Sequence, residues 1–310
     1  MKIPPQDREL SRACVGAARA RPEESPESEF ASGWRLTDEV SGTPDYTMGY
    51  GEEYLQALLR VSATTHAAHL LPHLEPGFRV LDFGCGPGTI SIGLAEAVAP
   101  GEVHGVDMEA SQIDLARMFA KRYGRDNAVF HVGDVTDLPF EDDSFDVAHC
   151  HNVLMHVPDT QAVLREVNRV VKPGGIIASR EMISGSSFTH PDFEVLRNAW
   201  DMFEDLLEAD DGHPQMGKDL KTHFVEAGLT NYRVSASFDT FTTPDEITFI
   251  HQIAQQWFLA PEITEAAIKY GAATEALCDH IGVAYDRWKD HPGAFAAVAY
   301  GELLAWKPES

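Results

Sequence analysis

The stretch VLDFGCGPGTISIGLAEAV, from Val80 to Val98, most constrains how this chain can fold. It begins with the apolar residues of a buried strand and ends with apolar residues at helical spacing. Gly84, Gly86 and Gly88 lie in the turn between the two. A glycine-rich turn from strand to helix is typical of a nucleotide-binding site.

Alternating strand and helix patterns follow this turn. Short apolar strand candidates are separated by amphipathic stretches long enough for crossover helices; they are residues 79–83, 102–107, 128–132, 145–150 and 175–181. The pattern predicts an α/β fold: a Rossmann-like, doubly wound, mostly parallel seven-stranded sheet with helices on both faces. Ligands of such sheets bind at the carboxyl ends of the strands, where we expect Asp82, Asp107, Asp134 and His151 to converge.

Three regions of the chain differ in composition. Residues 1–45 are rich in Arg, Glu, Pro and Ser, which predicts a mobile N-terminal arm. Residues 46–184 contain the cofactor-binding core, with a lead-in helix predicted between Gly51 and Leu74. Residues 185–310 complete the sheet with a strand at 232–238 and a last strand in FAAVAYGELLAW. Helical insertions in this region are expected to form a substrate cap.

Composition also excludes several classes of function. A formal net charge of −25 repels phosphate backbones, so we expect no nucleic-acid partner. No apolar run is long enough to cross a bilayer, and the first residues do not resemble a signal peptide, which predicts a cytoplasmic protein without a membrane partner. The four cysteines form no Cys-x-x-Cys pair, which predicts free thiols rather than disulfides or a thiolate zinc site.

The spacing of the glycines favours one cofactor. A dinucleotide fingerprint is G-x-G-x-x-G, whereas this turn is G-x-G-x-G and follows Asp82. A carboxylate at this point would repel a pyrophosphate. S-adenosylmethionine has no phosphate, and its sulfonium and ammonium groups can be stabilised by Asp82 and by carbonyl oxygens near Gly84. The sequence therefore favours S-adenosylmethionine over NAD.

Residues 77–181 resemble the class I S-adenosylmethionine-dependent methyltransferases. The motifs after the glycine turn are VHGVDMEASQIDLAR, VGDVTDLPFEDDSFDVAHC and LREVNRVVKPGG. The stretch GDVTDLPFEDDSFDVAHCHNVLMHVPD is most similar to sequences of the ubiquinone/menaquinone C-methyltransferase-like group, which includes many natural-product and small-acid methyltransferases.

The resemblance implies cofactor contacts for four residues beyond the glycines. Asp107 would accept from both ribose hydroxyls, and Met108 would pack on one face of the adenine. Asp134 would accept from the adenine amino group, and Val135 would cover the other face. Tyr50, in YTMGYGEEY, could fold over the cofactor as a lid; an aromatic contact that staples the start of the next helix is the alternative.

Methyl transfer is an in-line displacement, so the protein mainly aligns the acceptor and excludes water. His151 is the first candidate to face the acceptor or the methionine end of the cofactor, and His156 is the second. A general base is needed only if the acceptor must lose a proton. Arg180 and Glu181 could orient an acceptor at the rim of the fifth strand, with Arg180 binding a carboxylate or phenolate; an ion pair closing the strand is the alternative.

Other histidines and aromatic residues receive less specific predictions. We expect no metal, because the histidines of HCHNVLMH lack a partner ligand at metal spacing. His66, His69 and His73 share a helical face and are expected at the surface or at an interface. Four aromatic side chains could wall an apolar acceptor pocket or belong to the core: Trp200, Phe203, Trp257 and Phe258.

These features predict an enzyme, an S-adenosylmethionine-dependent methyltransferase for a small molecule: a phenol, an enol, a carboxylate or an activated carbon. The DNA and RNA amino-methyltransferases carry a Pro-Pro-aromatic segment after the fourth strand; its absence argues against methylation of exocyclic amines. The alternatives are a non-catalytic S-adenosylmethionine-binding or interaction protein and non-methyl sulfonium chemistry on the same fold. The expected partner is a small-molecule methyl acceptor, and the chain could form a homodimer.

Overall fold

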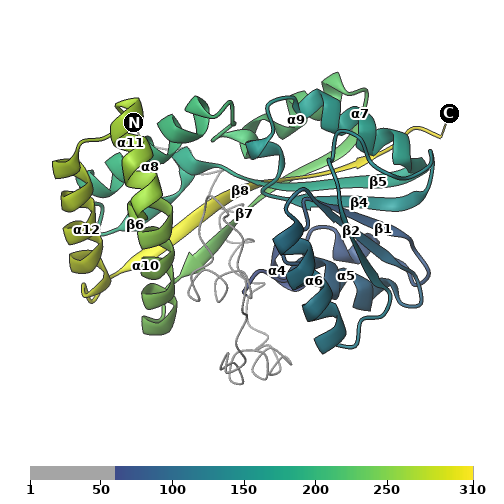
Figure 1. Ribbon diagram of the computed structural model, residues 1–310, viewed down its shortest axis with the longest axis horizontal. Coiled ribbons are helices and arrows are strands. Elements are labelled where there is room, and N and C mark those ends of the chain that lie inside the picture. Colours follow the sequence, from purple (N-terminus) through teal and green to yellow (C-terminus); the bar gives the residue numbers. More distant parts are fainter. Residues whose placement is uncertain (1–59, 310) are drawn as a thin grey trace, which may run out of the picture. The chain divides into compact units, whose positions relative to one another are not determined.

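The computed structural model describes residues 60–309 (Figure 1). The predicted arm, Tyr50 and the first part of the lead-in helix lie outside the described residues. Five parallel strands form most of one sheet in the order β3-β2-β1-β4-β5. They are β1 (Val80–Phe83), β2 (Val103–Asp107), β3 (Ala128–Val132), β4 (Phe145–His151) and β5 (Val171–Met182).

Three antiparallel pairings extend this sheet. Strand β8 (Phe295–Trp306) pairs with β5, and β7 (Asn231–Phe241) pairs with β8 along nearly its whole length. A short strand, β6 (Phe188–His190), pairs with the first residues of β8, beyond the part that β5 contacts. The doubly wound, mostly parallel sheet is confirmed, but it has eight strands rather than the seven predicted, because β6 is added.

Helices cover both faces of the parallel strands (Figure 1). Helices α4 (Ala63–His66), α5 (Thr89–Val98) and α6 (Ala110–Arg122) lie on one face. Helices α7 (Thr160–Val170) and α9 (Met216–Glu226) lie on the other. Helix α7 illustrates how these helices pack on the sheet. Its apolar residues recur at helical spacing and are all buried: Val163, Leu164, Val167 and Val170. Burial on both faces explains the continuous apolar runs of the central strands.

The remaining helices gather around β6 and the adjoining ends of β7 and β8, on the left in Figure 1. They are α8 (Glu194–Ala209), α10 (Pro244–Leu259), α11 (Pro261–Tyr270) and α12 (Glu275–Lys289). The ring of Trp200 lies 5.3 Å from that of Phe258 and 6.2 Å from that of Trp257, between centroids. A cavity of about 20 Å³ is left beside them, roughly the room of one water. Of the two interpretations of these aromatic residues, packing in the hydrophobic core therefore describes them better than lining an acceptor pocket.

The lead-in helix predicted up to Leu74 is wrong for residues 60–74. This segment contains only the four-residue α4 and a 3-10 turn, η2 (Leu71–His73). Pro72 explains the difference, because proline has no N–H to donate and its ring clashes with the carbonyl four residues earlier. The histidines of this segment consequently do not follow one continuous helix.

Candidate functional site

The glycine turn packs tightly on its protein side. A Cβ on Gly84 would lie 2.3 Å from a methyl group of Val153, which follows β4, and one on Gly88 would lie 2.8 Å from the ring of Phe130. Both glycines have positive φ, +69° and +75°. Around Gly86, by contrast, no heavy atom that a Cβ would meet is closer than 4.0 Å. The turn is therefore held against β3 and β4 and leaves open space at its middle glycine.

Asp107 ends β2 directly beside this turn. Its Oδ2 accepts a hydrogen bond from the Gly86 N–H at 2.9 Å, and its Oδ1 accepts from the Glu109 N–H at 3.0 Å. Burial raises the pKa of Asp107, while these two hydrogen bonds act to lower it. The next side chain, Met108, is 75% exposed. A half-buried carboxylate beside an exposed apolar side chain fits a ribose and an adenine ring.

Asp134 and Val135 follow β3, the neighbouring strand. Asp134 is exposed, and its Oδ1 accepts from both the N–H and the Oγ1 of Thr136, which lowers the pKa of the carboxyl group. Val135 is half-buried. Because β2 and β3 are adjacent parallel strands, Asp107, Met108, Asp134 and Val135 lie along one edge of the sheet, as the sequence predicts.

Asp82 does not lie at that edge. It is buried in β1; its Oδ2 accepts from Ser91 Oγ of α5, and its Oδ1 lies 3.0 Å from Nδ1 of His149 in β4. Both carboxylate oxygens thus have protein partners. The expectation that Asp82 faces the cofactor needs correction: its contacts join β1, α5 and β4 beneath the glycine turn.

Glu181 is also placed differently from the rim position that we expected. Its side chain is fully buried, and its carboxylate accepts from the backbone N–H groups of Val153, Leu154 and Met155 at 3.0–3.2 Å. These residues begin the turn after β4 that includes η3 (Leu154–His156). Burial raises the pKa of Glu181, and the three N–H donors oppose that rise. Glu181 therefore holds the turn that contacts Gly84 rather than an acceptor.

A Glu181→Gln variant is expected to lower the free energy of unfolding by about 1–3 kcal/mol, because an amide cannot accept from three N–H groups as a carboxylate does. Urea denaturation followed by circular dichroism measures this change. The exposed Glu226→Gln on α9 is the matched control and should leave stability unchanged. Equal stability of the two variants would show that the three hydrogen bonds contribute nothing.

The side chain of Arg180 points to the face of β5 opposite to that of Glu181, and it is only 1% exposed. Its Nη2 donates to Asp239 Oδ1 at 2.7 Å, and its Nε lies 3.3 Å from Ser237 Oγ and 3.5 Å from Glu302 Oε1. The guanidinium also stacks 3.6 Å from the centre of the Tyr300 ring. Two carboxylates balance this cation, as in the ion-pair alternative, while its Nη1 is buried without a hydrogen-bond partner among the described residues. Anchoring of an acceptor carboxylate by Arg180 stays a prediction.

His151 lies at the carboxyl end of β4, half-buried, next to the turn that touches Gly84. Its Nδ1 lies 3.1 Å from the carbonyl oxygen of Arg180. A carbonyl can only accept, so Nδ1 carries the proton and Nε2 of the neutral ring is unprotonated, with Nδ2 of Asn152 at 3.5 Å. Burial lowers the pKa of His151 well below the ordinary value, and the neighbouring His66, Arg180 and His149 lower it further.

The Nδ1–H form of His151 is therefore expected at neutral pH. Long-range ¹H–¹⁵N NMR of the imidazole nitrogens distinguishes this tautomer from the Nε2–H form, and the spectrum of a His151→Ala variant identifies the signals. An Nε2–H or doubly protonated ring at pH 7 would contradict the assignment.

Of the two expectations for His66, His69 and His73, surface or interface, packing against other elements describes them better, and all three are partly buried. The ring of His66 lies 4.9 Å from that of His151, the ring of His69 lies 6.2 Å from that of His149, and His73 contacts Trp306. The missed signal is the apolar spacing of Ala63, Ala67 and Leu70, all of which are buried; it places the side of the segment that carries His66 against the sheet.

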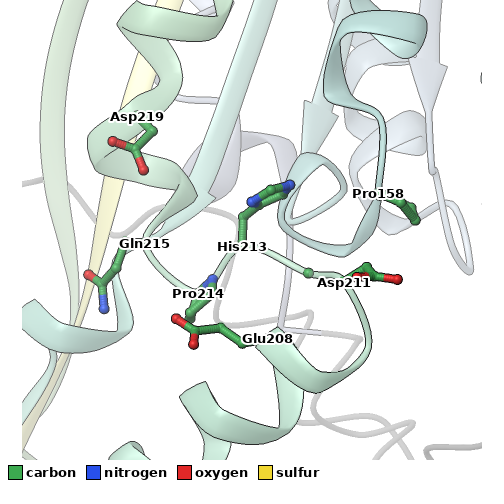
Figure 2. Close-up of a pocket in the computed structure, with 8 residues that line it drawn as sticks. Pro158, Glu208, Asp211, His213, Pro214, Gln215 and Asp219 are labelled. Atoms are coloured by element: carbon green, nitrogen blue, oxygen red, sulfur yellow. The ribbon is translucent and has the colours of Figure 1, made fainter.

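His156 lies on η3 and is exposed. The loop between α8 and α9 joins this turn, because the His213 N–H donates to the Met155 carbonyl at 2.7 Å. A surface pocket of about 530 Å³ opens beside it, and Figure 2 shows the acidic side chains around it; it is lined by Pro158, Glu208, Asp211, His213, Gln215 and Asp219, among others. Within residues 60–309 no group of His, Cys, Asp or Glu is placed to hold a metal ion.

Comparison with known proteins identifies the family. A family model described as a methyltransferase domain matches residues 74–228, half of the chain, including the glycine turn and β1 to β5. The chain belongs to this methyltransferase family. An uncharacterized methyltransferase of Schizosaccharomyces pombe is 28% identical over 253 residues, which cover 79% of this chain and 90% of that protein.

Two further comparisons agree with the family. The demethylmenaquinone methyltransferase of Staphylococcus aureus is 34% identical over 176 residues, covering 52% of this methyltransferase and 71% of that protein. The crystal structure of the YcgJ protein from Bacillus subtilis superposes with a TM-score of 0.54 at 20% identity, covering 80% of this chain and all of that one, and shows the same fold. The predicted enzyme class and the cofactor S-adenosylmethionine are confirmed. No helix described in residues 60–309 has the length and apolar character to span a membrane.

Proposed function

We propose that this methyltransferase acts on a small acceptor that loses a proton during the reaction: a phenol, an enol or an activated carbon. The observation that carries the proposal is the contact of His151 Nδ1 with the Arg180 carbonyl at the carboxyl end of β4, which leaves Nε2 as the unprotonated nitrogen of a neutral ring. A group in that state can act as general base at neutral pH. When bound, S-adenosylmethionine supplies an activated methyl group.

Different residues of the protein would bind different parts of this cofactor. We assign the ribose hydroxyls to Asp107, the adenine faces to Met108 and Val135, and the adenine amino group to Asp134. The open space at Gly86 accommodates the methionine part. Because β4 is the neighbour of β1, this arrangement brings the methyl end toward His151.

The acidity of the acceptor follows from the environment of His151. A base with a lowered pKa removes a proton most readily from an acceptor that is itself acidic. Asp239 and Glu302 near Arg180 would stabilise the proton once it is on His151. The same carboxylates repel an acceptor that arrives as an anion, so we favour phenols and enols that still carry their proton at neutral pH over the carboxylates that the sequence left open.

The test is a methyl-transfer assay on matched acceptors. The protein is incubated at neutral pH with S-adenosylmethionine and with phenols and enols that are protonated at that pH, together with the carboxylic acid and amine analogues of each ring, and S-adenosylhomocysteine is quantified. Turnover of the phenols or enols is the expected result. Turnover of the carboxylates or amines alone would overturn the proposal.

Three broader expectations belong to the same proposal. The net charge of −25 supports a small acceptor over a nucleic acid. A cytoplasmic location is consistent with the free thiols Cys85, Cys150 and Cys278. Whether the protein forms a homodimer is decided by sedimentation equilibrium of the full chain.

A further inference from the structure

The ring of His151 is surrounded by a connected set of contacts. The ring of His66 meets it nearly edge-on, at 4.9 Å between centroids and 65° between planes. The ring of Tyr300 lies 5.5 Å away on another side. Arg180 contacts both Tyr300, through its guanidinium, and His151, through its carbonyl oxygen. His151 is thus held by β5, β8 and the segment that contains α4.

Asp239 of β7 connects the two sides of this set. Its Oδ1 accepts from Arg180 Nη2 at 2.7 Å, and its Oδ2 lies 3.3 Å from Nε2 of His66. The tautomer of His66 is fixed from its other nitrogen, because the Ser62 N–H points to Nδ1 at 3.3 Å. Nδ1 therefore accepts, and Nε2 donates its proton to Asp239. Both ring nitrogens of His66 are therefore occupied by hydrogen bonds, so His66 has no free lone pair with which to take a proton from an acceptor.

The charges that face His151 come from every element packed against it. The groups that act on His151 directly are His149 from β4, Arg180 from β5, His66 from the α4 segment and the ring of Tyr300 from β8. Asp239 of β7 and Glu302 of β8 lie one contact further out: both carboxylates contact Arg180, Asp239 also contacts His66, and Glu302 interacts electrostatically with His69. One guanidinium is balanced here by two carboxylates. Asp239 is the carboxylate that contacts both the cation and His66, so it can affect His151 through charge and through position.

We propose that His66 and Asp239 are positioning residues for His151: together they hold its ring and set the charge around it, although neither touches a reacting atom. The inference rests on the proposed function of His151 as the base. It also assigns a purpose to the segment before β1, whose histidines were expected at the surface or at an interface. Docking of this segment on β7 through His66 and Asp239 completes the environment of His151.

Histidine NMR of the full chain tests this proposal without an acceptor. The Cε1–H signals of the 14 histidines are titrated with S-adenosylhomocysteine present, and His151→Ala identifies the signal of His151. His66→Gln keeps a donor to Asp239 but removes the positive charge that the His66 ring carries when it is protonated, so the titration midpoint of His151 should rise by about 0.5–1 pH unit. Asp239→Asn removes a nearby negative charge, so the midpoint should fall by about the same amount.

The matched control is His73→Gln, on the same segment but against Trp306, which should leave the midpoint in place. Opposite shifts in the two test variants support a positioning role, because a general loosening of the fold would move both in the same direction. Unmoved midpoints, shifts of the same sign, or an equal shift in the control would overturn it. If Asp239→Asn does not fold, as judged by circular dichroism, the comparison of His66→Gln with the His73→Gln control decides: an upward shift is expected in the first and none in the second, and equal shifts would overturn the proposal.

The outcome is separable from that of the proposed function. If His151→Ala keeps full turnover while the midpoints shift in opposite directions, the base assignment fails and the physical coupling stands. If His151→Ala loses turnover while the midpoints do not move, the base assignment stands and the positioning role of His66 and Asp239 is overturned.

Discussion

Replacing His151 by alanine is expected to reduce turnover by roughly 10²–10⁴-fold while the affinity for S-adenosylmethionine changes by no more than a few fold. The reason is that proton removal and alignment act in the transition state, whereas the residues assigned to the cofactor lie on β2 and β3. Steady-state kinetics with an accepted phenol or enol, together with calorimetry for the cofactor, measures the two quantities separately.

His131→Ala is a suitable control, because His131 lies on β3 and stacks on His104, away from β4. It should retain turnover. A parallel fall of affinity and rate in His151→Ala would instead place His151 on the methionine end of the cofactor. Unchanged turnover would make it a packed structural residue and move the search to His156.

Replacing Asp107 by alanine is the second large expected effect, with S-adenosylmethionine bound roughly 10²-fold more weakly, or about 2.7 kcal/mol. Two ribose hydroxyls would lose a charged acceptor in a half-buried position. Isothermal calorimetry on the folded variant measures the change, and the exposed Asp114→Ala on α6 is the control. NAD should not bind in the same assay.

Unchanged cofactor affinity in a folded Asp107→Ala variant would remove the ribose assignment. Because the carboxylate also accepts from Gly86 and Glu109, folding must be checked by thermal denaturation. Asp107→Asn separates the two effects: it keeps an acceptor for one N–H group but removes the negative charge.

Elements with a long, regular pattern could be predicted from the sequence. Strands β1 to β5, β7 and β8 lie within a few residues of their predicted positions. The prediction of the lead-in helix was wrong for residues 60–74 because helical apolar spacing continues past Pro72. The missing N–H and the ring of this proline disfavour a helix there, whatever the spacing of the apolar residues. Strand β6 was missed because its three residues are too few to show alternation and depend on pairing with β8.

The residues of the candidate site also differ in how far the sequence predicts their positions. Asp107 and Asp134 could be placed because a residue that ends a parallel strand must lie at the ligand edge, whatever its rotamer. The partners of Arg180 could not, because Asp239 and Glu302 come from β7 and β8, far along the chain. One local signal was available: Ser235, Ser237 and Asp239 alternate along β7, which places three polar groups on one face.

Arg180 and Glu181 are consecutive residues of β5 whose side chains enter opposite faces of the sheet, each into its own polar partners. A slip of β5 by one position would exchange them, leaving a guanidinium against three N–H donors and a carboxylate against two others. Mispaired registers of this strand are therefore penalised electrostatically on both faces at once. Insertions or deletions of a single residue within β5 should consequently be among the least tolerated changes in the chain.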